Sequence, residues 1–286
     1  MLGLLFGMRI RFLGTGTSAG VPVIACDCVV CTSTDPRDTR TRTSAVLEFV
    51  DASGRERVVL IDASPDFREQ VLREGIGRID AILFTHNHVD HVWGLDEVRR
   101  FNEVQGEAID VWADEHTHGS LRRVYQHIFE PEKNIQKSFI ARLTPRVLRA
   151  GEAIELFGLR VTPMTLMHGV QRILGFRFEA VEKDGLKDSG GLLPLAYCTD
   201  VVEIPDSSRV YLEGAPGGVK TLVLDALRHR PHATHFTVEQ ACVEAGRIGA
   251  SRTYFVHMTH DLGHGVTNRE LPDGMELAYD GLVLGE

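Results

Sequence analysis

The sequence predicts an α/β fold in which two packed β-sheets lie between layers of helices, a four-layer αββα sandwich. Strand-like apolar segments dominate both halves of the chain, and helix-like segments lie between them. Clusters of histidine and cysteine extend from Cys26 to His260, and a site assembled from both ends of the chain indicates one domain. No linker rich in proline, glycine or serine divides the 286 residues, so we expect a single domain over residues 1–286.

The elements of the first half are predicted from apolar runs between turn signals. They are strands at Arg9–Leu13, Ser44–Val50 and Val58–Asp62, a helix over Pro65–Glu74, a strand over Ile79–Phe84 and a helix around Leu95–Val104. Gly54 is expected to turn the hairpin between the second and third strands.

The second half is predicted in the same way. Its strands are Ile154–Leu156, Leu159–Met164, Leu174–Glu179, Leu193–Cys198, Leu222–Asp225 and Arg252–Val256. A helix is expected over Val238–Ile248, because Thr237 and Gln240 have the spacing of a capping box.

Residues 114–148 fit this scheme poorly. They are rich in arginine and lysine, with Tyr125, Phe129 and Phe139 interleaved. We interpret them as a helical insertion with a solvated basic face and a small apolar face of its own. The alternative is a lid that supplies cations to a phosphorylated substrate.

The motif H-x-H-x-D-H at residues 86–91 directly follows an apolar run that is typical of a buried strand. His86 and His88 alternate with period two and can reach one metal ion, while Asp90 and His91 turn toward a second. A lone histidine is usually a surface residue or a satisfied core residue, but three histidines and an aspartate at this spacing favour a metal site. The pattern resembles the metallo-β-lactamase superfamily of metal-dependent hydrolases.

Three further residues of ligand type stand at the ends of predicted strands in the order that this superfamily uses: His168, Asp200 and His257. The resemblance implies that His86, His88 and His168 hold a first metal and that Asp90, His91 and His257 hold a second. Asp200 would bridge both, and Asp90 counts among the catalytic residues.

Asp62 stands at the end of another predicted strand, ahead of Pro65. In this superfamily an aspartate at such a place commonly orients a ligating histidine. The alternative is that Asp62 caps the helix that follows.

Two divalent ions about 3.5–4 Å apart can share a hydroxide whose parent water has its pKa lowered toward about 7. That hydroxide attacks an electrophile while the ions neutralise the developing charge. Imidazole and carboxylate ligands suit zinc, manganese and iron alike, so we expect two catalytic ions, zinc or manganese.

A second metal site is predicted at Cys26, Cys28 and Cys31, which form the pattern C-x-C-x2-C. Three thiols so close together indicate a disulfide framework or a zinc site. Five cysteines in the chain, and no recognisable secretory signal, favour a reducing compartment and therefore metal. Structural zinc usually has four ligands, and His260 is the best candidate for the fourth.

These cysteines, the early Gly-Thr-Gly-Thr-Ser of residues 14–18 and the H-x-x-H of residues 257–260 together resemble the phosphoribosyl cyclic phosphate phosphodiesterases of the carbon–phosphorus lyase pathway. The resemblance covers nearly the whole chain. It implies a small, cyclic phosphodiester substrate of ribosyl or nucleoside type, one structural zinc on the three cysteines and His260, and a homodimer.

Three histidines in residues 227–236 form another family-like signature, and the resemblance singles out His235 as the general acid. A proton donor beside an alkoxide leaving group contributes about 10²–10⁴-fold in rate. The alternative is that all three histidines line a surface loop.

Composition excludes some partners. The net charge of −9 gives no broad positive surface, so a long nucleic acid is not expected. The apolar residues 1–7 are too few to span a bilayer. We expect a cytoplasmic protein that does not associate with a membrane. The rival functions are a tRNase Z-like RNA endonuclease, hydrolysis of a thioester or lactam, and a binding or oxidation role like that of pyrroloquinoline-quinone biosynthesis proteins.

Overall fold

The computed structural model describes residues 7–136, 139–181, 191–213 and 217–285. Within these ranges the chain forms two seven-stranded sheets. The first has the strand order β14-β1-β2-β3-β4-β5-β6, with bounds β1 Arg9–Gly14, β2 Ser44–Val50, β3 Glu56–Ile61, β4 Ala81–Leu83, β5 Ile109–Ala113, β6 Leu143–Val147 and β14 Val283–Gly285. The second has the order β13-β12-β11-β10-β9-β8-β7, with bounds β7 Ile154–Leu156, β8 Leu159–His168, β9 Gln171–Ala180, β10 Leu195–Cys198, β11 Thr221–Asp225, β12 Arg252–Val256 and β13 Met275–Leu277.

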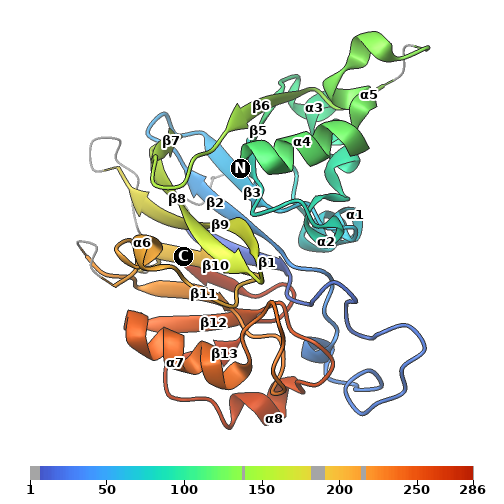
Figure 1. Ribbon diagram of the computed structural model, residues 1–286. Helices are drawn as coiled ribbons and strands as arrows, with labels where there is room; N and C mark the ends of the chain where they lie inside the picture. The colour runs from blue at the N-terminus through green and yellow to red at the C-terminus, as the bar shows by residue number, and fades with distance from the viewer. Residues whose placement is uncertain (1–6, 137–138, 182–190, 214–216, 286) are drawn as a thin grey trace.

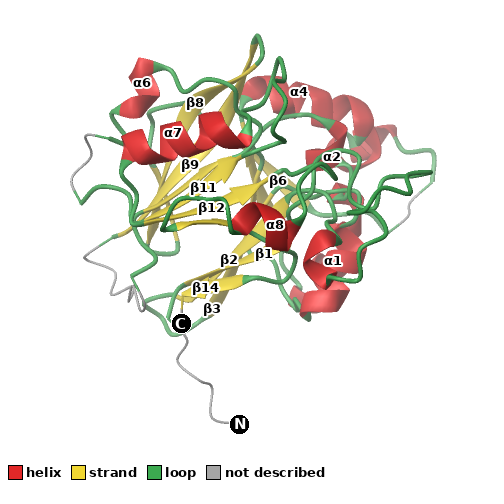
Figure 2. Ribbon diagram, turned by 90° about the horizontal axis from the view of Figure 1, so that it is seen from below, coloured by secondary structure: helices red, strands yellow, loops and turns green. Residues whose placement is uncertain are grey.

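The helices cover the outer faces of the two sheets (Figures 1 and 2). They are α1 Phe67–Glu74, α2 Val89–Val92, α3 Arg99–Gln105, α4 Glu115–Val124, α5 Gln126–Phe129, α6 Asp206–Arg209, α7 Val238–Ile248 and α8 His264–Asn268, with short 3-10 turns at Pro36–Asp38, Leu95–Val98 and Pro131–Lys133. No helix of the described residues is both long enough and apolar enough to cross a membrane.

Three separate apolar clusters show the four layers. The central cluster lies between the sheets and includes Phe12 of β1 and Phe176 of β9. A second cluster packs Phe67 of α1 against the outer face of the first sheet, and a third packs Ile248 of α7 against the outer face of the second. The αββα sandwich predicted from the sequence is confirmed.

Alternation along the strands explains how each sheet serves two clusters. In β2, Leu47 belongs to the central cluster while its neighbour Val46 faces the helices. Because side chains of a strand point to opposite faces in turn, a strand buried on both sides needs apolar residues at nearly every position. The continuous apolar runs in the sequence have this cause.

The structure corrects the interpretation of residues 114–148. Their first part is helical, as α4 and α5, but they end in β6, which pairs in parallel with β5. Pro145 lies within β6 and removes one hydrogen-bond donor, which a strand at the edge of a sheet tolerates. This proline and the exposed Arg146 made the segment unlike a strand in sequence. Strands β5, β13 and β14 were also not predicted.

The direction of the strands determines where the site forms. Strands β3 and β4 run parallel, and so do β10, β11 and β12, with β8 in the same direction because β9 is antiparallel to both of its neighbours. Carboxyl ends of parallel strands meet at one edge of a sheet. The residues at these ends therefore meet where the two sheets face each other.

Candidate metal centre

Three of the residues at strand ends have backbones in the left-handed region. Asp62, Asp200 and His257 follow β3, β10 and β12 with φ angles of 59°, 55° and 62°. Residues other than glycine adopt such angles rarely, at about 1–3 kcal/mol each, and the rest of the structure must hold them there. Strain repeated at three strand ends indicates that the direction of these side chains is under functional constraint.

His86, His88 and His168 form the first cluster. Their ligand atoms lie within 4.8 Å of one another. The centre of the His88 ring is 4.6 Å from that of the His86 ring and 5.0 Å from that of the His168 ring, and both contacts are edge to face. The structure thus brings His168, at the end of β8, to the loop that follows β4.

Asp90, His91, Asp200 and His257 form the second cluster, also within 4.8 Å. Asp200 Oδ2 lies 3.1 Å from His257 Nε2 and 3.3 Å from His91 Nε2. The same oxygen is 3.8 Å from His86 Nε2 of the first cluster. Asp200 therefore stands between the two clusters, as a bridging carboxylate must.

Burial and charge set the protonation of these groups. Burial lowers the pKa of His86 well below its usual value and that of His168 to about 4, which favours neutral imidazoles with a free lone pair. For Asp200, burial opposes ionisation, but His257 and His91 outweigh it and hold the pKa of the carboxyl well below its usual range. Neutral imidazoles and ionised carboxylates are the forms that bind cations.

His91 is the exception in this set. Burial lowers the pKa of its imidazole, but the carboxylates of Asp200, Asp90 and Asp62 outweigh burial and raise it well above the usual value. Among the described residues, the ion pairs of Asp90 and Asp200 are with histidines only. The cluster therefore has more negative charge than its own side chains neutralise, which a divalent cation would balance.

Unpartnered atoms provide a test of whether metal ions fit. His86 Nε2 and His91 Nε2 are both buried and have no hydrogen-bond partner in the part of the chain that the structure describes. A buried polar atom without a partner costs about 1–3 kcal/mol. Both nitrogens lie near Asp200 Oδ2, at 3.8 and 3.3 Å, so the seven side chains fit a pair of divalent ions.

Asp62 contacts His91 at Nδ1, the ring nitrogen that does not face Asp200. Its carboxylate accepts hydrogen bonds from Thr85 N and Thr85 Oγ1, both at 2.8 Å, and lies 2.7 Å from His91 Nδ1. Helix α1 begins only at Phe67 and has Asp66 at its N-cap position. The structure thus places Asp62 beside His91 rather than at the start of the helix.

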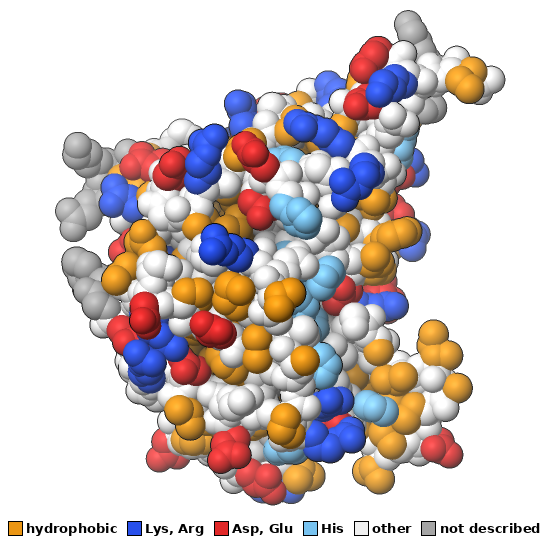
Figure 3. Space-filling view, in the orientation of Figure 1, with side chains coloured by type: hydrophobic (Ala, Val, Ile, Leu, Met, Phe, Trp, Pro, Cys, Tyr) orange, Lys and Arg blue, Asp and Glu red, His pale blue; other side chains and the backbone are white. Residues whose placement is uncertain are grey.

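His235 lies beside both clusters. Its ring centre is 4.6 Å from that of His168 and 4.7 Å from that of His257. His229 and His232 of the same loop are exposed, whereas His235 is buried. Figure 3 shows histidine side chains in a row down the middle of this face.

Asp225 is a residue of the site that the sequence reasoning missed. It is fully buried and its Oδ2 lies 2.7 Å from His235 Nδ1. Burial raises the pKa of the Asp225 carboxyl well above its usual value and lowers the pKa of His235. The signal was present, because Asp225 ends a predicted strand just as Asp62 does.

Cys26, Cys28, Cys31 and His260 form a separate cluster. The three sulfur atoms lie 3.2, 3.5 and 3.4 Å from His260 Nδ1. Zn–S bonds of about 2.3 Å and Zn–N bonds of about 2.0–2.1 Å place tetrahedral ligands about 3.6 Å apart, close to these distances. All three cysteines are free thiols, and the backbone N–H of Cys31 lowers the pKa of Cys28 to about 6. The group fits a zinc ion.

Short backbone contacts join the histidine clusters to the cysteine cluster. His257 and His260 lie on one segment, where Met258 N donates to Thr15 O at 3.0 Å. A Cβ at Gly16 would stand 2.7 Å from Arg40 O, so glycine is needed for this approach. The buried Arg40 donates to Thr259 O at 2.9 Å. The glycine-rich loop thus fixes the segment that carries both histidines.

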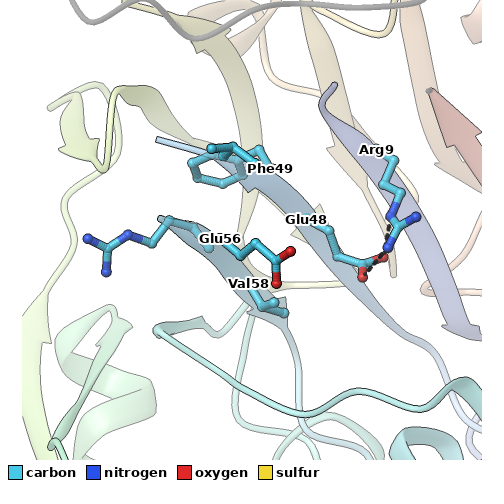
Figure 4. A pocket seen from close by; sticks show the side chains of 7 residues that line it. Arg9, Glu48, Phe49, Glu56 and Val58 are labelled. Carbon is cyan, nitrogen blue, oxygen red and sulfur yellow. Dashed lines mark hydrogen bonds and ion pairs between the residues drawn. The ribbon is translucent and has the colours of Figure 1, made fainter. Parts of the chain in front are cut away.

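A hollow of about 80 Å³ is a competing candidate for the functional site, but an arginine that lines it already has an ion-pair partner. It is lined by Arg9, Glu48, Phe49, Glu56 and Val58 at the hairpin end of β2 and β3, opposite to Asp62 (Figure 4). The guanidinium of Arg9 is already paired with Glu48 at 2.9 Å. The histidine clusters remain the better candidate.

The sequence model of the family described as "Beta-lactamase superfamily domain" matches residues 57–258, most of the chain. The chain belongs to the metallo-β-lactamase superfamily. A crystal structure of a diphosphatase from the PhnP family is 42% identical, covers 98% of both chains and superposes with a TM-score of 0.82. The protein is therefore a member of the PhnP family within this superfamily.

Two other relatives are less similar to this chain in identity, in coverage or in both. An octanoyltransferase from Porphyromonas gingivalis is 33% identical over 282 residues, 96% of this chain and 51% of that protein, so this PhnP-family chain spans about half of its curated relative. Zinc-bound PqqB from Methylobacterium extorquens is 22% identical, with coverage of 97% and 100% and a TM-score of 0.71, which shows a shared fold. Membership of the PhnP family supports a metal-dependent hydrolase.

Proposed function

We propose that the protein is a metal-dependent phosphodiesterase that hydrolyses a small, cyclic phosphodiester of ribosyl or nucleoside type. The observation that carries this proposal is the convergence of seven ligand-type side chains, from both sheets, beside the buried His235. His86, His88 and His168 would hold one divalent ion, Asp90, His91 and His257 a second, and Asp200 both. The zinc-like cysteine site would fix the segment from His257 to His260.

When bound, the two ions would lower the pKa of a shared water toward about 7 and neutralise charge on the phosphoryl oxygens. The chain's own residues supply position and a proton. Asp200 and the histidines of the two clusters would fix the attacking oxygen, and His235, whose ring contacts those of His168 and His257, would stand within reach of the leaving oxygen. A ribose oxygen leaves as a strong base, so a proton from His235 Nε2 would accelerate its departure about 10²–10⁴-fold.

A linear diphosphate is the second candidate substrate, because the PhnP-family protein that is 42% identical is described as a diphosphatase. The leaving group of a diphosphate is a phosphate, which is already acidic. Protonation by His235 would then contribute little. The dependence of the rate on His235 therefore separates the two substrate classes.

The rival functions have less support. An RNA endonuclease of the tRNase Z kind needs a surface for a folded RNA, and the net charge of −9 offers no general attraction for one. A purely binding role, or an oxidation role like that of the pyrroloquinoline-quinone biosynthesis proteins, does not call for a complete dinuclear ligand set beside a buried histidine. Hydrolysis of a thioester or a lactam does not account for the presence of the cysteine site.

The experiment is an assay of bis(p-nitrophenyl) phosphate, ribosyl and nucleoside cyclic phosphates, linear diphosphates and a tRNA precursor, with manganese or zinc restored. We expect turnover of cyclic phosphodiesters that is lost in Asp200→Asn. His116→Ala is the matched control, because His116 is an exposed histidine of α4 that belongs to no cluster among the described residues. Failure of the metal-loaded protein to hydrolyse any phosphodiester would refute the proposal, and turnover of diphosphates alone would select the second candidate.

A further inference from the structure

We infer that Asp225 positions two groups at once: one oxygen fixes the ring of His235 and the other fixes the ring of the proposed metal ligand His257. The inference builds on the proposed function, because it assigns roles to both histidines. It concerns a residue that belongs to neither predicted ligand set. Asp225 acts through its neighbours and is a positioning residue.

One carboxylate oxygen of Asp225 has two hydrogen-bond partners. Oδ2 lies 2.7 Å from His235 Nδ1 and accepts the backbone N–H of Val201 at 3.0 Å. These two donors occupy both lone pairs of this oxygen. Oδ2 therefore orients His235 and, through Val201, is anchored to the segment that follows Asp200.

The other oxygen has no partner of its own. Asp225 Oδ1 is buried and has no hydrogen bond from any described residue, and the same holds for His257 Nδ1, which lies 4.0 Å away. A buried polar atom without a partner destabilises the fold, so a small movement that joins the two atoms is favoured. The donor and the acceptor are complementary, because a carboxylate oxygen can only accept from an imidazole N–H.

Metal binding would require this contact. His257 Nε2 faces the carboxylates of Asp200 and Asp90 at 3.1 and 3.4 Å, so Nε2 is the atom that would bind a cation. The proton of the neutral ring must then reside on Nδ1, and ligating histidines almost always donate this proton to a carboxylate, a carbonyl or water. Asp225 Oδ1 is the unpartnered acceptor beside it.

The sheet holds this arrangement rigidly. Asp225 pairs with Val256, the residue before His257, in the parallel register of β11 and β12. The rings of His235 and His257 are stacked with an interplanar angle of 14°, so their Nδ1 atoms can share one carboxylate. In contrast, the contacts of Asp62 are with His91 and Thr85, and they serve one ligand histidine.

The test compares Asp225→Asn with His235→Ala and Asp62→Asn. The affinity of the metal-free protein for Mn²⁺ is measured by calorimetry, and turnover is measured with nitrophenyl and alkyl leaving groups. We expect Asp225→Asn to bind one of two ions 10–100-fold more weakly, in about the range seen for lost outer-shell partners. It should also lose more rate with the alkyl than with the nitrophenyl leaving group. His235→Ala should show only the second effect, and Asp62→Asn only the first.

Wild-type Mn²⁺ affinity in Asp225→Asn, or an unchanged ratio of the two rates, would overturn the inference. If Asp225→Asn does not fold, the zinc-loaded wild-type protein with ¹⁵N-labelled histidine decides. A slowly exchanging Nδ1–H of His257 supports the contact with Asp225, and an unprotonated or freely exchanging Nδ1 refutes it. Calorimetry and NMR do not depend on turnover, so failure of the proposed function remains distinguishable from failure of this inference.

Discussion

Replacing Asp62 with asparagine tests the support of the metal centre with little change in shape. Asp62 is fully buried, and three donors converge on its carboxylate: Thr85 N on Oδ1, and Thr85 Oγ1 and His91 Nδ1 on Oδ2. Its φ of 59° suits asparagine better than most residues, so the backbone need not move. An effect of Asp62→Asn therefore reports on the side-chain contacts.

The magnitude follows from counting donors. Asparagine has one acceptor oxygen and an NH2 group, so in either orientation its NH2 faces Thr85 N–H or His91 Nδ1–H, donor against donor. One buried donor is left unsatisfied, at about 1–3 kcal/mol. The negative charge that polarises His91 is also lost. We expect the free energy of unfolding to fall by about 1–3 kcal/mol and affinity for one of two ions to fall about 10–100-fold.

Calorimetric titration of metal-free protein with Mn²⁺ and thermal unfolding measure these two quantities. Asp80→Asn is the matched control, because Asp80 is a largely buried carboxylate that accepts from Val58 N and from the guanidinium of Arg78, which belong to no metal cluster of the described residues. It should lower the melting temperature and retain wild-type affinity for Mn²⁺. Wild-type metal affinity and stoichiometry in Asp62→Asn would refute the reasoning.

Three further predictions concern other parts of the molecule. Cys28→Ser should remove one bound zinc and lower the melting temperature more than kcat, and an unchanged melting temperature would reject a structural zinc. His235→Ala should retain its metals but turn over about 10²–10⁴-fold more slowly with alkoxide leaving groups, whereas an equal loss with acidic ones would exclude an acid role. Burial, with Arg37 and Arg40 nearby, lowers the pKa of His264 to about 4. The unfolded chain, with its usual value near about 6.5, then binds more protons, so the free energy of unfolding should fall by up to about 3 kcal/mol from pH 6.5 to 4. Denaturant titrations of His264→Gln should show a weaker pH dependence, and an unchanged one would contradict the assignment.

Local spacing made much of the site predictable. The motif at residues 86–91 specifies its own geometry, because alternation along an extended segment sends His86 and His88 to one side. His168 and His257 could be proposed because they end predicted strands in the order that the superfamily uses. Whether these side chains hold metal ions stays a prediction.

Other features had no local signal. Strand β6 was missed because Pro145 and the exposed Arg146 are tolerated at an edge that only the assembled sheet defines. The left-handed backbone of Asp200 and Asp62 is likewise invisible in sequence, because aspartate is compatible with several conformations and the surrounding contacts select this one.

The sequence alone determined the fold class, most of the strands and the kinds of ligand available, because periodicity and spacing act over a few residues. The tertiary structure decided which atoms meet. The 3.3 Å approach of Asp200 to His91, the cluster of Cys26 with His260 and the place of Asp225 between two rings all join residues distant in the chain or set apart by a sheet register. These distances depend on how two sheets pack around a shared apolar core, and that packing is a property of the whole chain.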